Sequence, residues 1–170
     1  VEVGRCDLVS TRLDFAGEPA GWRTGIPVAW LCDPQRPIPA ATRGVHHILD
    51  EDVAGCMLWR EVLDGVASPG MSGADFFAAH NAGFERQWVT DVLTGGKPWI
   101  CTWKCALRLW PEAPDHKNQT LRYWLSLPAD RATASPAHRA GPNTYVTALL
   151  LERMLATPGV TLNQLVEWSD

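Results

Sequence analysis

Apolar and polar residues in the second half of the chain follow two periods. Short apolar runs at 76–79 and 99–101 are typical of buried strands. Apolar residues then recur every three or four positions, which predicts helices at 81–95, 103–110, 120–125, 143–155 and 161–168. Pro111 ends the second of these helices, and Thr161 with Gln164 forms a capping box for the last. This alternation of strand and helix predicts an α/β domain.

The first third of the chain is interrupted more often by proline and glycine. Residues 1–9 alternate loosely and predict a strand, while residues 10–44 have room only for short strands, with 28–31 as the best candidate. Apolar residues at helical spacing predict a helix over 56–66, ended by Ser68-Pro69-Gly70. A segment rich in proline, alanine and serine at 128–142 predicts a loop.

In the predicted helix after residue 81, Phe84, Trp88 and Val92 fall on one stripe, which we expect to face the core. Other tryptophans, at positions 103, 110 and 124, also fall on apolar stripes. Core packing is therefore the expected role of these tryptophans, although an exposed indole can stack on a nucleobase.

Composition narrows the class of protein. The sequence has 170 residues, of which 46% are hydrophobic and 20% charged, and a formal net charge of −4. We expect a single domain over 1–170 with a core of its own, because a chain of this size buries roughly 70% of its unfolded surface. It has no apolar run of membrane-spanning length and no signal-peptide pattern at its start, so we expect a cytoplasmic protein without a membrane partner. Its five cysteines lack C-x-x-C pairs and are expected to be reduced.

The first candidate for chemistry is the segment from His80 to Glu85. It combines a strand end, a polar turn and, at Glu85, a carboxylate in the first turn of a helix. In open α/β sheets, ligands bind at the carboxyl ends of strands, where this carboxylate would lie. The alternative is structural, with Asn81 capping the helix and Glu85 placed favourably in the helix dipole.

The second candidate is His138, in the predicted loop five residues before Asn143. A histidine can deprotonate water because its ordinary pKa lies near 6.5. The alternative is a solvated loop histidine. His46 and His47 are weaker metal candidates, because adjacent side chains point apart on an extended chain and no third ligand has a recognisable spacing.

Several blocks in a fixed order resemble the DnaQ-like (DEDDh) 3′ to 5′ exonucleases. They are the strand at 1–9, Ile38-Pro39 through Val45-His46-His47-Ile48, Ala79-His80-Asn81-Ala82, Trp99-Ile100-Cys101-Thr102 through Leu109-Trp110-Pro111, and His138-Arg139-Ala140 through Thr147-Ala148-Leu149-Leu150. The resemblance implies a ribonuclease H-like fold with a mixed five-stranded sheet flanked by helices. It also implies hydrolysis at DNA 3′ ends, single-stranded at the site, with two Mg²⁺ or Mn²⁺ ions.

The resemblance also implies roles for individual residues. His138 would be the general base, Glu85 and Asn143 would occupy metal-ligand positions, and His80, Asn81 and Arg139 would contact substrate. Three further basic residues, Arg86, Lys104 and Arg108, are candidates for phosphate contacts.

The sequence departs from the family pattern of four carboxylates. Glu85 and Asn143 stand where the family has aspartates, and the family's first strand with its Asp-x-Glu pair is absent. Glu2 matches a structural glutamate of the neighbouring strand. We expect an Asp-x-Glu strand upstream of Val1 in the natural protein, and an inactive or impaired enzyme without it.

Two other functions fit the same residues. One is a non-catalytic nucleic-acid-binding module that has kept the fold and lost the metal site. The other is a structural domain whose exposed tryptophans form a partner surface.

Overall fold

The computed structural model describes residues 1–17, 19–67 and 71–170. The predicted helix end at Ser68-Pro69-Gly70 lies outside the described residues. The strands are β1 (Glu2–Arg5), β2 (Leu8–Leu13), β3 (Pro19–Thr24), β4 (Val28–Leu31), β5 (Phe77–Ala79) and β6 (Trp99–Cys101). The helices are α1 (Ala40–His46), α2 (Asp50–Val53), α3 (Trp59–Glu61), the π-helix η1 (Val62–Ala67), α5 (Ala82–Glu85), α6 (Asp91–Thr94), α7 (Thr102–Leu109), α8 (Asn118–Trp124), α9 (Ala140–Leu155) and α10 (Leu162–Glu167).

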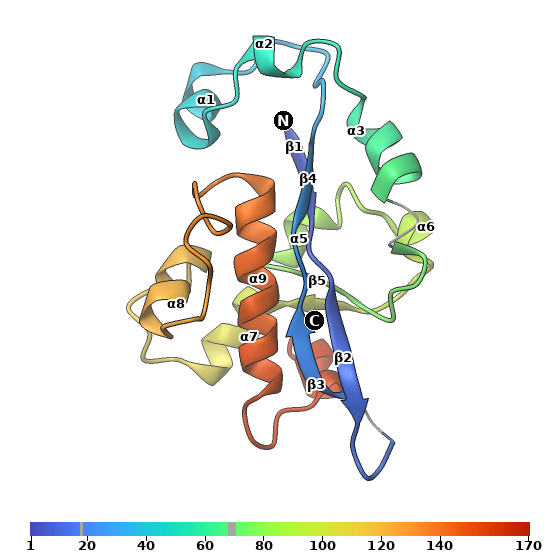
Figure 1. The fold of residues 1–170 in the computed structure, drawn as a ribbon, viewed down its shortest axis with the longest axis vertical. Helices are drawn as coiled ribbons and strands as arrows, with labels where there is room; N and C mark the ends of the chain where they lie inside the picture. Colours follow the sequence, from blue (N-terminus) through green and yellow to red (C-terminus); the bar gives the residue numbers. More distant parts are fainter. Residues whose placement is uncertain (18, 68–70) are drawn as a thin grey trace.

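A long antiparallel hairpin is formed by the first four strands (Figure 1). β1 pairs with β4 and β2 with β3, and the loop between β3 and β4 is joined to the β1–β2 junction by a hydrogen bond of 2.8 Å from Gly25 N to Asp7 O. The predicted strand at 1–9 is therefore two strands with a break near Asp7. The prediction of a strand at 28–31 is confirmed.

The two apolar runs form a second, parallel pair. β5 and β6 pair in register from Phe77 with Trp99 to Ala79 with Cys101, which confirms both predicted buried strands. The described residues form three two-stranded pairs, so the single five-stranded sheet is not observed. In particular, no backbone pairing among the described residues joins β1 to β5.

The central helix α9 packs against the hairpin and against β5, and it contributes much of the core. Val146, Leu150, Leu151 and Met154 are buried in one cluster with residues of β6, α7, α8 and α10. The helix begins at Ala140, earlier than predicted, because Pro142 is tolerated in a first turn, where its missing N–H is not needed.

One prediction about helices was wrong, and two helices were not predicted. The helix predicted over 81–95 is divided into α5 and α6. Thr90 has an extended backbone (ψ 168°) and is the N-cap residue of α6. As a result, its stripe does not face the core: Phe84, Trp88 and Val92 are 57%, 45% and 92% exposed. The helices α1 and α2 were not predicted, since they lie in or beside the proline-rich stretch.

The predicted capping box is confirmed. The capping box of α10 is present, with Gln164 N donating to Thr161 Oγ1 at 3.2 Å and Thr161 N donating to Gln164 Oε1 at 2.9 Å. All five cysteines are free thiols. Among the described residues, none of the helices combines the length and the apolar character needed to cross a membrane.

Candidate functional site

A cavity of about 1560 Å³ lies between the hairpin, β5 and α9. β1 forms one wall and β5 another, and both strands contact α9. Because no described backbone pairing bridges β1 and β5, the cavity opens along two strand edges. Four of the predicted site residues line it, namely His80, Glu85, His138 and Asn143. The structure thus brings together residues that are up to 63 positions apart in the sequence, from Asn143 back to His80.

Glu85 contributes a partly buried carboxylate from the end of α5. Burial raises the pKa of this carboxyl. Its Oε2 atom is buried and has no hydrogen-bond partner among the described residues. Such an atom loses hydration without compensation, so it is available to a cation or a donor from a ligand.

His138 and Asn143 are joined through the turn that precedes and enters α9. The backbone N–H of His138 donates to Asn143 Oδ1 at 3.3 Å, and Asn143 N donates to Arg139 O at 3.0 Å. The His138 backbone has a left-handed conformation (φ 65°) and its side chain is exposed. Asn143 therefore fixes the backbone of the histidine and leaves the imidazole open to solvent.

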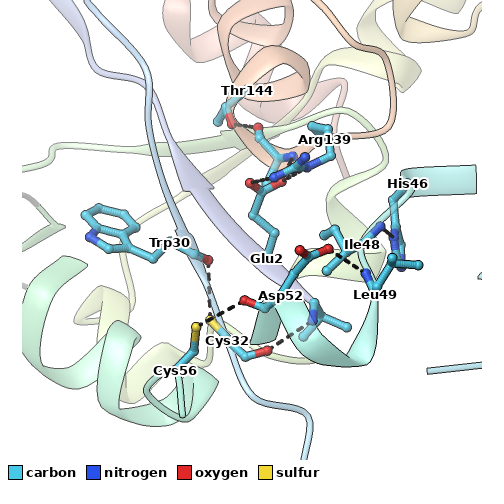
Figure 2. Close-up of polar contacts among 12 residues, drawn as sticks. Glu2, Trp30, Cys32, His46, Ile48, Leu49, Asp52, Cys56, Arg139 and Thr144 are labelled. Carbon is cyan, nitrogen blue, oxygen red and sulfur yellow. Dashed lines mark hydrogen bonds and ion pairs between the residues drawn. The ribbon is translucent and has the colours of Figure 1, made fainter. Parts of the chain in front are cut away.

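Glu2 contacts Arg139 at the start of α9 (Figure 2). Its carboxylate accepts hydrogen bonds from Arg139 Nε at 3.1 Å, Arg139 Nη2 at 2.9 Å and Ala140 N at 2.6 Å. The hydrogen bond to Glu2 raises the pKa of Arg139. A carboxylate at the first N–H groups of a helix is also favoured by the helix dipole. We call Glu2, Arg139 and Ala140 the α9 clamp.

Gly4 allows the close approach on which the α9 clamp depends. A Cβ atom at Gly4 would lie 2.6 Å from the carbonyl carbon of Ala140 and 2.7 Å from its oxygen. Only a residue without a side chain lets β1 come this near to the first turn of α9. The distance between β1 and α9, and with it the position of the His138 turn, is therefore set by Gly4 and Glu2 together.

His80 is held inside the protein. Its Nδ1 lies 2.9 Å from Thr102 Oγ1 and its Nε2 lies 2.8 Å from the carbonyl oxygen of His116. Burial lowers the pKa of the ring, so the neutral form is favoured. Both ring nitrogens are engaged, and His80 fixes the end of β5 beside the cavity rather than offering a free donor to a ligand.

The remaining predicted contacts are arranged differently. Asn81 precedes α5 with a left-handed backbone (φ 82°), and its side chain makes no capping hydrogen bond. The prediction that the Asn81 side chain caps this helix was therefore wrong. Arg139 is tied to Glu2. Lys104 Nζ donates to Ser169 O at 2.8 Å and Arg108 Nη1 donates to Trp168 O at 2.7 Å. Both side chains are therefore bound to backbone carbonyl groups that follow α10. Arg86 is exposed next to Glu85.

The described residues do not form a metal site by themselves. No group of three or more histidine, cysteine, aspartate or glutamate side chains able to hold a metal ion occurs within 1–17, 19–67 and 71–170. Glu85 Oε2 is one available anionic ligand, and the Asn143 oxygen is neutral and already accepts from His138. Two closely spaced divalent cations need several anionic oxygens, so this set is insufficient.

Sequence analysis did not find the link between Glu2 and Arg139, which are 137 positions apart. It also missed Asn118, whose Nδ2 donates to Thr147 Oγ1 at 2.9 Å and to the Asn143 carbonyl at 3.5 Å. No local pattern marks either contact. The resemblance identified Glu2 as a structural glutamate, but it did not indicate the partner of Glu2.

Comparisons with known proteins fit this architecture. No family model matches the chain. Exodeoxyribonuclease 10 from Escherichia coli K12 and its counterpart from strain O6:H1 are both 33% identical over 141 residues, 83% of this chain. The chain spans 60% of the length of these curated relatives. A solved structure, exonuclease X in complex with 5′ overhanging duplex DNA, aligns with a TM-score of 0.74 and 25% identity over 99% of both chains.

Proposed function

Because this chain is a DnaQ-like relative of exonuclease X, we propose that it acts on DNA as a 3′ to 5′ exonuclease. The observation that supports this proposal is the convergence of Glu85, with its unpartnered buried oxygen, His138 and Asn143 around one cavity. In the proposed reaction, water attacks the phosphorus of the terminal phosphodiester, and the 3′ oxygen of the preceding nucleotide leaves.

His138 is the proposed general base. Its imidazole is exposed at the cavity while its backbone is held by Asn143, so the ring has access to a water molecule without being displaced. Within the α9 clamp, Glu2 holds Arg139, the residue after His138, and thereby limits movement of the histidine. His80 and Asn81 place the start of α5, and with it Glu85, at the cavity.

Two Mg²⁺ or Mn²⁺ ions belong to the proposal, although the described residues hold too few anionic ligands for them. Held by Glu85 and further carboxylates, such ions would orient the water and stabilise charge on the leaving oxygen. We propose that further carboxylates lie on an extended segment between β1 and β5, where the cavity has the length of both strand edges.

The test extends the chain at Val1 with a strand that contains Asp-x-Glu, combined with Asn143→Asp. With Mg²⁺ and a single-stranded oligonucleotide labelled at its 5′ end, we expect a ladder of products shortened from the 3′ end. Chelation and His138→Ala should each abolish it. No cleavage by the extended protein, or cleavage that survives chelation, would contradict the proposal.

A second candidate function is a non-catalytic nucleic-acid-binding module, favoured by the neutral Asn143 and the insufficient ligand set. It predicts DNA binding that is unaffected by chelation and by Asn143→Asp. Calorimetric titration with Mn²⁺, followed by a short single strand, separates the two functions, because only the nuclease should bind the ion more tightly after Asn143→Asp.

A further inference from the structure

One face of α8 carries two polar residues within an apolar stripe. The four positions at the spacing of one helical face are Asn118, Leu121, Arg122 and Leu125. Leu121 is fully buried in the main core cluster and Leu125 packs against that cluster, so this face is turned inward, and α8 lies beside α9 (Figure 1). Asn118 is partly buried and Arg122 is only 6% exposed. Both polar side chains therefore act inside the protein.

Arg122 binds the loop that leads to His138. Its Nη1 donates to the carbonyl oxygen of Ala134 at 3.0 Å and to Gln119 Oε1 at 3.2 Å, and its guanidinium lies 5.0 Å from the centre of the Tyr123 ring. In the part of the chain that the structure describes, Arg122 forms no ion pair. Ala134 is 1% exposed and lies four residues before His138. Arg122 thus holds the buried start of residues 134–143, which we call the His138 segment.

Stability alone does not account for Arg122. Taking a guanidinium out of water is costly, and an apolar side chain of similar volume is often neutral or more stable at a buried position. The arginine adds direction, because its rigid planar group holds the Ala134 carbonyl in one orientation. The chain therefore approaches the turn at His138 from a fixed point.

Asn118 binds the other end of the His138 segment. Its Nδ2 donates to Thr147 Oγ1 at 2.9 Å and to the Asn143 carbonyl oxygen at 3.5 Å, and Thr147 Oγ1 donates to the same carbonyl at 2.9 Å. Asn143 in turn accepts from the His138 backbone N–H through its side chain. Asn118 therefore acts on the His138 turn through Asn143.

We propose that Asn118 and Arg122 are positioning residues for the imidazole of His138. From one face of α8 they hold the two ends of the His138 segment, and the α9 clamp holds its middle. Three points of attachment limit the movement of a loop that is rich in proline, alanine and serine. This inference deepens the proposed function and rests on it for the role of His138 as general base.

Hydrogen exchange followed by NMR tests the attachment in the protein as it is. Arg122→Met keeps an apolar side chain of similar length but removes the donors, so exchange of the Ala134 and His138 amides should speed up about tenfold. Asn118→Leu removes a neutral donor, and the Asn143 amide should exchange about fivefold faster. Arg122→Lys keeps a cationic donor and should restore most of the protection at Ala134.

Glu152→Leu is the matched control. Glu152 lies further along α9, and its Oε2 accepts from Thr24 N at 2.8 Å and from Thr24 Oγ1 at 2.6 Å. The substitution removes a contact between α9 and β3 without touching α8. It should leave exchange in the His138 segment unchanged.

The kinetic test uses the extended Asn143→Asp protein with Mg²⁺ and a single-stranded oligonucleotide. A misplaced base slows the chemical step more than it weakens substrate binding, so Arg122→Met and Asn118→Leu should each lower kcat about tenfold or more and change KM by less than about threefold. Arg122→Lys should recover most of kcat, and Glu152→Leu should leave both constants unchanged.

The outcomes separate this inference from the proposed function. Unchanged exchange in Arg122→Met and Asn118→Leu would overturn the inference whether or not the protein cleaves DNA. Faster exchange with an unchanged kcat would also overturn it, because the two residues would then have a structural role alone. Faster exchange in a protein that never cleaves DNA would refute the nuclease and still support the attachment of the His138 segment. Asn118→Leu keeps the test decisive if Arg122→Met does not fold.

Discussion

Replacing Glu2 with glutamine tests whether one carboxylate holds the start of α9. Glu2 Oε2 accepts from Arg139 Nε at 3.1 Å and Ala140 N at 2.6 Å, and Oε1 accepts from Arg139 Nη2 at 2.9 Å. Glutamine has one acceptor oxygen, which can serve the first two donors. Its NH₂ group then faces Nη2, donor against donor, so one hydrogen bond is lost and the other two lose the negative charge of their acceptor.

The expected cost follows from these three contacts. Hydrogen bonds to charged groups contribute about 1.5–3 kcal/mol and neutral ones about 1 kcal/mol. The Glu2 side chain is only 9% exposed, but that of Arg139 is 30% exposed and can be rehydrated, which reduces the loss. We expect Glu2→Gln to lower the free energy of unfolding by about 2 kcal/mol and to speed hydrogen exchange at the Ala140 amide.

Urea unfolding followed by tryptophan fluorescence measures this change. Arg43→Gln is the matched control, because the Arg43–Asp50 pair is 3.8 Å long and its side chains are 41% and 49% exposed. An exposed pair contributes about 0.5 kcal/mol or less. If both variants lose the same small amount, or if the Ala140 amide exchanges no faster in Glu2→Gln, the carboxylate does not hold α9 and the argument fails.

Three further predictions use the same unfolding assay. Gly4→Ala should lower the free energy of unfolding by about 1–3 kcal/mol, because its Cβ would overlap the Ala140 backbone. The control, Gly44→Ala in α1, has nothing within 4 Å of its Cβ and should be neutral or slightly stabilising. Equal effects of the two substitutions would refute this prediction. Burial raises the pKa of Glu85, so the folded state binds the proton more tightly than the unfolded chain, and stability falls as pH rises above the ordinary value of 4.5. Glu85→Gln should therefore stabilise the protein at pH 7 and give no such gain near pH 4. Burial lowers the pKa of His80, so the unfolded chain binds the proton more tightly and stability is lost as pH falls through about 6.5; His80→Gln should reduce this slope, and an unchanged slope would contradict the assignment.

The elements that could be predicted from the sequence depend on local interactions. The capping box at Thr161 and Gln164 joins residues three positions apart, and the short apolar runs of β5 and β6 are each followed directly by a polar residue, His80 or Thr102. Such signals are complete within a few residues, so they do not need the rest of the fold.

The predictions that were wrong depend on tertiary structure. The apolar spacing of Phe84 and Trp88 correctly suggested a helical turn, but spacing does not show whether a stripe meets the core or solvent. The extended backbone at Thr90 interrupts the predicted helix, and the side chains of Phe84 and Trp88 are exposed. For the same reason, sequence analysis found Glu85, His138 and Asn143 as separate candidates but could not show that they share a cavity or that Glu2 anchors the turn between them.

Asn143 weakens metal binding at the site because its side chain is neutral, and not because the turn has the wrong conformation. Asn143 Oδ1 accepts from the His138 N–H at 3.3 Å, and an aspartate oxygen can accept the same hydrogen bond. The helix dipole favours a negative charge in the first turn of α9, as the Glu2 carboxylate at Ala140 N shows, so an aspartate at position 143 is also favoured there. Asn143→Asp should therefore preserve the turn while adding a second anionic group to the cavity that Glu85 also lines. For this reason the substitution tests the metal ligands of the site without disturbing the position of His138.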